Sequence, residues 1–199
     1  MFQVPRSMIN ESGVTLIEII VVVAIITIFS AILISDFPSI ERQFYLTRAA
    51  YQLAQDLRRV QSLSLSGSFL PGGQSISGYG LYINTDTNPQ SYILYADSCK
   101  DQKYTIDDPT CPAGDYTQGT LGTIDMTQGG RYPEVYIEGL TGIDGGAITS
   151  IDFTPPNPTT TIQNISAGYN QIGIILGLKS DPAKTKEVDV NTAGFINVK

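Results

Sequence analysis

The chain has 199 residues, a formal net charge of −7 and two cysteines, and it contains neither histidine nor tryptophan. Without histidine it cannot form a Ser-His-Asp or Cys-His catalytic pair, an imidazole general base or a histidine metal site. Two cysteines are too few for a four-cysteine zinc or iron–sulfur site. Most familiar catalytic constellations are therefore excluded. We expect a protein that is not an enzyme and that uses no cofactor, with calcium as the lesser alternative.

The negative charge lies in the last two thirds of the chain. Residues 1–13 and residues 14–67 each carry equal numbers of acidic and basic side chains, whereas residues 68–199 hold 14 acids and 7 bases. An acidic body repels the phosphate backbone of nucleic acids. We therefore do not expect nucleic-acid binding.

One long apolar run lies near the N-terminus. Leu16 to Ile34 contains only three polar residues, Glu18, Thr27 and Ser30. As a helix, these 19 residues would be about 28 Å long, close to the thickness of a bilayer core. The run is longer than the core of a signal peptide, and Ser35-Asp36-Phe37-Pro38 after it is no small-residue cleavage site. The sequence predicts a retained membrane helix.

Glu18 is the unusual residue of this run. Placing a carboxylate inside a membrane helix costs free energy, so such a residue is a candidate for a functional role. The alternative is an acid near the headgroups that the positive end of the helix dipole stabilises.

The residues around Glu18 form a known pattern. The sequence Gly13-Val14-Thr15-Leu16-Ile17-Glu18 resembles the N-terminal signature of type IV pilins and pseudopilins. The resemblance implies cleavage by prepilin peptidase between Gly13 and Val14, N-methylation of Val14, and a role for Glu18 in assembly. The leader departs slightly from the family, because Arg6 is its only basic residue and Val14 replaces the usual Phe.

The resemblance also implies partners and a location. The partners are prepilin peptidase, other pilin or pseudopilin subunits and the assembly platform of the inner membrane. The chain would cross the cytoplasmic (inner) membrane once and export its C-terminal part. It would then join a filament at the cell surface or across the periplasm.

Helical periodicity continues beyond the apolar run. A stripe with 4-3-4-3-4 spacing predicts a helix face that packs against the rest of the protein; it comprises Leu46, Ala50, Leu53, Leu57, Val60 and Ser64. Pro38 is expected to kink or loosen the helix, and Gly67 is the first residue that ends it easily. We expect a helix from Val14 to about Ser66.

Part of this helix resembles a subgroup of the family. Residues 46–68 are similar to the stem of H-type (general secretion pathway H/FimT-like) minor pseudopilins. The resemblance rests on Ala49, Leu53, Asp56-Leu57-Arg58 and Gln61-Ser62.

From about Phe69 the pattern is that of β-strands. Alternating or β-branched segments are separated by Gly, Pro, Asn and Asp, which predicts antiparallel sheets; they lie at 78–84, 91–96, 133–139, 147–153, 160–165, 171–178, 186–191 and 194–198. Residues 190–195 predict a terminal hairpin. The fold class is α+β, with one long helix packed on a β-rich head. The predicted parts are a leader (1–13), a transmembrane and assembly helix (14–35), an amphipathic stem (36–67) and a globular head (68–199).

The two cysteines lie in a polar stretch, residues 97–131. In an exported head, Cys99 and Cys111 are expected to form a disulfide worth about 3 kcal/mol, and two free thiols are the alternative. The same stretch holds a group of acids, Asp97, Asp101, Asp107 and Asp108. We interpret them as solvated surface residues, with calcium binding as the lesser alternative because calcium needs six or more oxygens.

We expect a structural subunit, of the minor kind, in a type IV pilus or a type II secretion pseudopilus. The first alternative is an adhesion or binding module that the filament presents. The second is a DNA-uptake pilin, which is disfavoured because the hairpin carries Phe195 and only one basic residue, Lys199, where relatives carry several.

Overall fold

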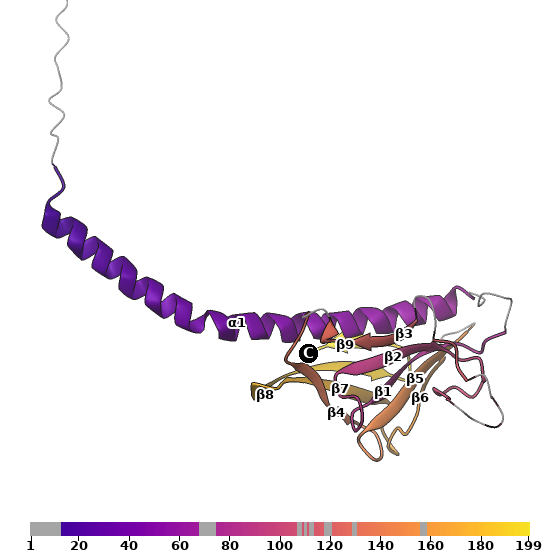
Figure 1. The fold of residues 1–199 in the computed structure, drawn as a ribbon. Helices are drawn as coiled ribbons and strands as arrows, with labels where there is room; N and C mark the ends of the chain where they lie inside the picture. The colour runs from indigo at the N-terminus through magenta and orange to yellow at the C-terminus, as the bar shows by residue number, and fades with distance from the viewer. Residues whose placement is uncertain are drawn as a thin grey trace, which may run out of the picture. The chain divides into compact units, whose positions relative to one another are not determined.

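The computed structural model describes residues 13–67, 75–106, 109, 111, 114–117, 121–128, 131–155 and 159–199. Within these residues it contains one helix, α1 (Leu16–Leu65), followed by β-strands (Figure 1). The strands are β1 (Tyr79–Asn84), β2 (Ser91–Ala96), β3 (Gly122–Asp125), β4 (Val135–Thr141), β5 (Ile148–Thr154), β6 (Thr159–Ile162), β7 (Gln171–Leu178), β8 (Asp181–Asn191) and β9 (Ile196–Val198). The predicted α+β class and the long N-terminal helix are confirmed.

Local sequence explains both ends of α1. The hydroxyl of Thr15 accepts a hydrogen bond from the backbone N–H of Glu18 at 3.3 Å, so Thr15 caps the first turn. After Leu65 the chain turns through Gly67, whose φ of 60° is easily adopted only by glycine. The helical backbone continues without a break through Pro38, although this proline lacks the N–H that an α-helix uses.

The strands form two antiparallel sheets. The first has the order β3-β2-β1-β5-β6 and the second the order β4-β7-β8-β9. The predicted hairpin is present, because Val188 pairs with Val198 and Val190 with Ile196 across β8 and β9. Two details differ from the prediction: β3 was not expected, and β8 begins at Asp181.

A single hydrophobic cluster joins the second half of α1 to both sheets. All six residues of the predicted stripe are buried, none more than 4% exposed. In β7 the side chains that point inward, Ile172, Ile174, Leu176 and Leu178, are fully buried. The amphipathic half of α1 is therefore a structural part of the head.

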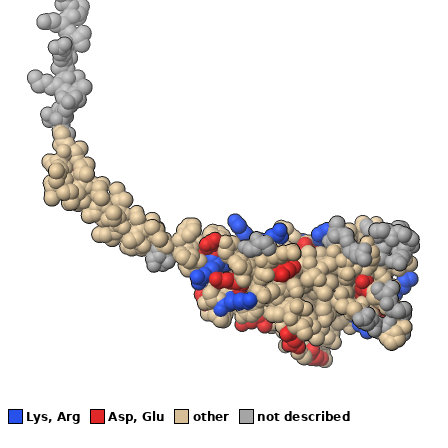
Figure 2. Space-filling view, viewed as in Figure 1, with Lys and Arg blue, Asp and Glu red and all other residues tan. Residues whose placement is uncertain are grey.

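The chain divides into two compact units, residues 1–41 and residues 42–199. From Leu16 onward the first unit is helical, and its large apolar side chains are exposed, from Val14 (65%) just before the helix to Leu33 (71%) and Ile34 (73%). The face of this segment seen in Figure 2 carries no charged side chain. An 18-residue window of α1 has a mean hydropathy of 3.0, which is apolar enough to cross a membrane by length and composition.

Candidate processing and assembly site

The predicted processing residues lie just before α1. Gly13 and Val14 precede the helix in non-helical backbone, and both are exposed. The carbonyl oxygen of Thr15 accepts the first helical hydrogen bonds, from Glu18 N at 3.1 Å and from Ile19 N at 3.3 Å. Val14 is therefore one residue from the helix cap, with its peptide bond to Gly13 accessible.

Glu18 lies in the first turn of α1, where its side chain is exposed. Thr15 and Glu18 are three residues apart, the spacing of a capping box, which the sequence analysis did not consider. The structure forms one half of this motif, the bond from Glu18 N to the Thr15 hydroxyl. Within the described residues the Glu18 carboxylate has no hydrogen-bond or ion-pair partner. It is therefore available to a positive group outside this chain.

Thr27, another polar residue of the apolar run, does not resemble a site. The hydroxyl of Thr27 donates to the carbonyl oxygens of Val23 at 3.0 Å and Ala24 at 2.8 Å. These bonds satisfy it within the helix, so it can lie in lipid at little cost. The Glu18 carboxylate, by contrast, has no such partner within its own helix among the described residues.

The stem residues that resemble the H-type subgroup make specific contacts with the head. The carboxylate of Asp56 accepts a 2.6 Å hydrogen bond from the hydroxyl of Tyr92. Arg58 donates to the carbonyl of Ile196, and Gln61 donates to the carbonyl of Gly194. These bonds hold the C-terminal hairpin against α1. They explain a structural role for these residues, and the H-type assignment itself stays a prediction.

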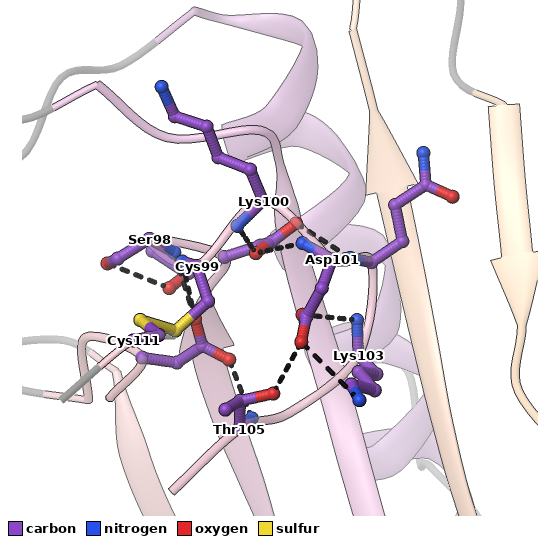
Figure 3. Close-up of a disulfide and its surroundings, with 11 residues drawn as sticks. Ser98, Cys99, Lys100, Asp101, Lys103, Thr105 and Cys111 are labelled. Atoms are coloured by element: carbon purple, nitrogen blue, oxygen red, sulfur yellow. Dashed lines mark hydrogen bonds and ion pairs between the residues drawn. A yellow bond between two sulfur atoms is a disulfide. The ribbon is translucent and has the colours of Figure 1, made fainter. Parts of the chain in front are cut away.

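Cys99 and Cys111 are joined by a disulfide in the head, with their Cα atoms 5.5 Å apart (Figure 3). Carboxylates organise the same loop. Asp97 accepts hydrogen bonds from the backbone N–H groups of residues 100–102, and Asp115 from those of Ser98, Cys99 and Thr105. The loop is therefore held by one covalent bond and two buried acids.

The interpretation of the acids as solvated surface residues is wrong for Asp97. Its side chain is fully buried, because its oxygens are needed by the loop backbone. Asp101 is partly exposed and pairs with Lys103 at 3.6 Å. Asp107 and Asp108 lie outside the described residues. Asp115, which the sequence analysis missed, is buried beside Asp97.

The carboxylates of Asp97, Asp101 and Asp115 lie within 4.8 Å of one another. Calcium prefers six to eight oxygen ligands at 2.3–2.6 Å. The lone pairs of Asp97 and Asp115 are already directed at backbone N–H groups. This donor set fits a loop-ordering cluster better than a calcium site.

Asp152 on β5 lies close to this cluster, and its pKa is raised further than that of Asp115. Its side chain is fully buried, and burial raises its pKa to about 7, with a further contribution from the charge of Asp97. The hydroxyl of Thr154 donates to one of its oxygens at 3.0 Å, and the other oxygen has no hydrogen-bond partner among the described residues. Burial likewise raises the pKa of Asp115 to about 6.

The comparisons with known proteins agree with the N-terminal geometry. The family model described as the prokaryotic N-terminal methylation motif matches residues 8–34. No curated protein and no solved structure matches the chain.

The match covers the segment that the structure shows as the exposed Gly13–Val14 junction, the Thr15 cap, Glu18 and the apolar half of α1. Behind it, the long helix and the antiparallel sheets form a pilin-like fold. Proteins with this motif are structural and generally without catalytic activity. The chain thus carries the prokaryotic N-terminal methylation motif at residues 8–34, followed by a long helix and a β-rich head, and these features are consistent with a precursor of the type IV pilin and pseudopilin family.

Proposed function

We propose that the chain is a subunit, of the minor kind, of a type IV pilus or a type II secretion pseudopilus. Prepilin peptidase cuts it between Gly13 and Val14, the new Val14 amine is methylated, and α1 then packs with the helices of other subunits. The observation that carries the proposal is the match of the methylation motif to residues 8–34. The assembly platform of the inner membrane would draw the processed chain from the bilayer into the filament.

The position of Glu18 supports its assigned role. After cleavage, the Val14 amine and Glu18 are one helical turn apart, so subunits packed side by side can pair the Glu18 of one with the amine of another. In a low-dielectric environment, removing one partner of such a pair leaves an unpaired buried charge. The contact between the two subunits is then strongly destabilised.

The sharpest test is Glu18→Gln. Glutamine keeps the side-chain length and suits a capping box, but it carries no charge. We expect Glu18→Gln chains to insert into the membrane and to be cleaved, yet to be absent from filaments sheared from the cells. Thr27→Ala is the matched control, because its hydroxyl is satisfied within the helix, and it should assemble normally.

Peptide mass spectrometry of the sheared filaments gives the readout. A methylated N-terminus at Val14 and a low abundance relative to other pilins support the minor role. If Glu18→Gln enters filaments as the unmodified chain does, Glu18 acts as a helix cap and not as the assembly carboxylate. A chain found only in membranes with residues 1–13 attached would contradict the proposed function itself.

The C-terminal hairpin supports a structural role over DNA uptake. Phe195 at its tip is 73% exposed, and Lys199 is already paired with Asp189 at 2.7 Å and with Glu187 at 3.6 Å. A neutralised lysine offers little attraction to a phosphate. We therefore propose no nucleic-acid partner for the chain.

A further inference from the structure

A basic hollow lies on the exposed side of the second half of α1. It has a volume of about 540 Å³. Three arginines line it, Arg48 and Arg59 from α1 and Arg131 from the segment before β4, together with Tyr51, Tyr132 and one acid, Asp56. Arg48 and Arg59 are eleven residues apart, so the hollow extends over about three turns of helix.

The positive charge of this basic hollow is only partly compensated by the residues that the structure describes. All three arginines are exposed, and in the described part of the molecule none of them has an ion-pair partner. The carboxylate of Asp56 is engaged by the hydroxyl of Tyr92. The lining therefore carries a net charge of +2 on a protein whose total charge is −7.

The head carries a matching set of acids, Asp86, Glu138 and Asp144. All three are exposed, and in the described residues none forms an ion pair. They surround the turn between β1 and β2. Asp86 lies in this turn. Glu138 is next to Ile137, whose N–H donates a hydrogen bond to the carbonyl of the turn residue Pro89. Asp144 lies in the loop before β5, in which the carbonyl of Ala147 accepts a hydrogen bond from the N–H of Thr85. We call these three residues the acidic margin.

The basic hollow and the acidic margin share no residue. In the view of Figure 2, basic side chains lie along the α1 side of the head and at its two ends, with acidic ones among them, and a further group of acidic side chains lies at the margin opposite α1. When two complementary surfaces lie at different places on one chain, the contact between copies is head-to-tail. Such contacts form rings or open filaments, and not closed two-fold dimers.

We propose that the basic hollow of one subunit receives the acidic margin of a second copy of this chain. The inference rests on the proposed filament function and names one contact within it. Exposed ion pairs give little affinity but fix orientation and suppress wrong registers. The anchored helices supply the high local concentration at which such a weak contact decides how neighbouring heads are placed. For a minor subunit, the contact can form only where two copies of the chain are neighbours in the filament.

Charge reversal on each surface tests the contact. The basic-reversed chain carries Arg48→Glu, Arg59→Glu and Arg131→Glu. The acid-reversed chain carries Asp86→Lys, Glu138→Lys and Asp144→Lys. Two differently tagged full-length copies are expressed together, extracted in detergent and purified through one tag, and the amount of the other copy is measured.

Each reversed chain should capture itself about tenfold less than the unmodified chain does, because three attractions become three repulsions. A mixture of one basic-reversed and one acid-reversed copy should recover capture, since every contact again joins opposite charges. High salt should weaken both the unmodified pair and the rescued pair by screening. The control reverses three exposed or half-exposed lysines outside the hollow, Lys100→Glu, Lys179→Glu and Lys186→Glu, and should leave capture unchanged.

Every variant is checked for the Cys99–Cys111 disulfide as a sign of a folded head. If reversal prevents folding, glutamine at the three arginine positions replaces it, with a smaller loss of capture expected. Unchanged self-capture in the reversed chains, or no recovery in the mixture, overturns the inference. Loss of capture of a co-expressed pilin with self-capture intact also overturns it, because the partner is then not a second copy. A chain that captures itself but is never cleaved at Gly13 contradicts only the proposed function.

Discussion

The head contains buried carboxylates, and its stability is expected to depend on whether single carboxylates are protonated. Asp97 and Asp152 are both fully buried, and Asp115 is 9% exposed. Asp97 and Asp115 recover part of the cost through backbone hydrogen bonds, whereas one oxygen of Asp152 lies without a partner among the described residues. An unpartnered buried charge is costly, so the neutral form of Asp152 is favoured.

This ionisation predicts that the head loses stability as the pH rises. The pKa of Asp152 is about 7 in the folded chain and 3.8 when unperturbed, so the folded state binds the proton more tightly. The stabilisation is complete below pH 4 and is lost as the pH rises through about 7. Between pH 5 and pH 8 the free energy of unfolding should therefore fall through this group, by an amount of the order of 2 kcal/mol.

Asp152→Asn tests this assignment, because asparagine keeps the shape and cannot ionise. Thermal unfolding at pH 5 and pH 8, followed by circular dichroism, should show a smaller pH dependence and a higher melting temperature at pH 8 than in the unmodified chain. Asp125→Asn is the control, since Asp125 is exposed and its hydrogen bonds with Thr127 lower its pKa. An unchanged pH dependence in Asp152→Asn would show that another group causes it.

Among the elements, α1 could be predicted almost completely from the sequence. Its apolar run has the length of a membrane helix, its stripe from Leu46 to Ser64 has the spacing of one helix face, and Thr15 and Gly67 provide conventional ends. Pro38 was expected to kink or loosen the helix; it lies inside continuous helical backbone, and the kink stays a prediction.

The strands were predictable where their pattern is strong and not where it is weak. The four-residue β3 alternates between half-buried and exposed side chains, lies at a sheet edge and contains a glycine, so little in its sequence distinguishes it from a loop. The early part of β8, Asp181 to Lys186, is largely exposed and has no alternating apolar side chains. Its pairing with β7 is a consequence of the tertiary structure.

Packing explains why position 80 in β1 is a glycine, and this reason could not be found from the sequence. A Cβ atom at this position would lie 2.5 Å from the ring of Tyr95, which occupies the space above the glycine. The phenol of Tyr95 in turn packs on the ring of Tyr104, with centroids 5.3 Å apart. The glycine is thus a requirement of a neighbouring aromatic side chain.

The contact of α1 with the sheets predicts a strong effect for one leucine of the stripe. Leu53 is completely buried, whereas Leu65, the last residue of the helix, is 52% exposed. Leu53→Ala should lower the free energy of unfolding by about 2–5 kcal/mol through lost burial and the cavity left behind. Leu65→Ala, the same chemical change at an exposed site, should cost less than about 0.5 kcal/mol.

Denaturant unfolding of the full-length chain in detergent, followed by circular dichroism, compares the two variants. Equal and small effects would mean that the second half of α1 does not share the core of the head. Equal and large effects would mean that Leu65 is covered by another part of the chain.

At the scale of the whole molecule, the residues of the N-terminal motif and the functional candidates of the head lie in different parts of the chain. The predicted processing junction and Glu18 could be proposed from the sequence, because they form a contiguous pattern of six residues. The basic hollow and the buried acids could not, because they join distant segments. Arg131 meets α1 more than seventy residues along the chain, and Asp152 meets Asp97 only after β5 has paired with β1.

The division of the chain into an apolar N-terminal segment and a head with its own core predicts which part folds independently. The exposed apolar side chains between Val14 and Ile40 belong to residues 1–41, whereas the hydrophobic core begins at Leu46. A chain that starts at residue 42 keeps the whole core and loses the apolar run. It should be soluble without detergent, contain the Cys99–Cys111 disulfide and unfold in one cooperative transition.

A chain that starts at residue 75 is the matched comparison. It keeps every strand but loses the buried face of α1, including Leu53, Leu57 and Val60, so both sheets would expose apolar residues that the helix covers. We expect this shorter chain to aggregate or to remain unfolded, as measured by size-exclusion chromatography and circular dichroism. If it folds as stably as the chain from residue 42, the stem merely lies on a complete head. If neither chain folds, the head depends on the membrane-embedded half of α1.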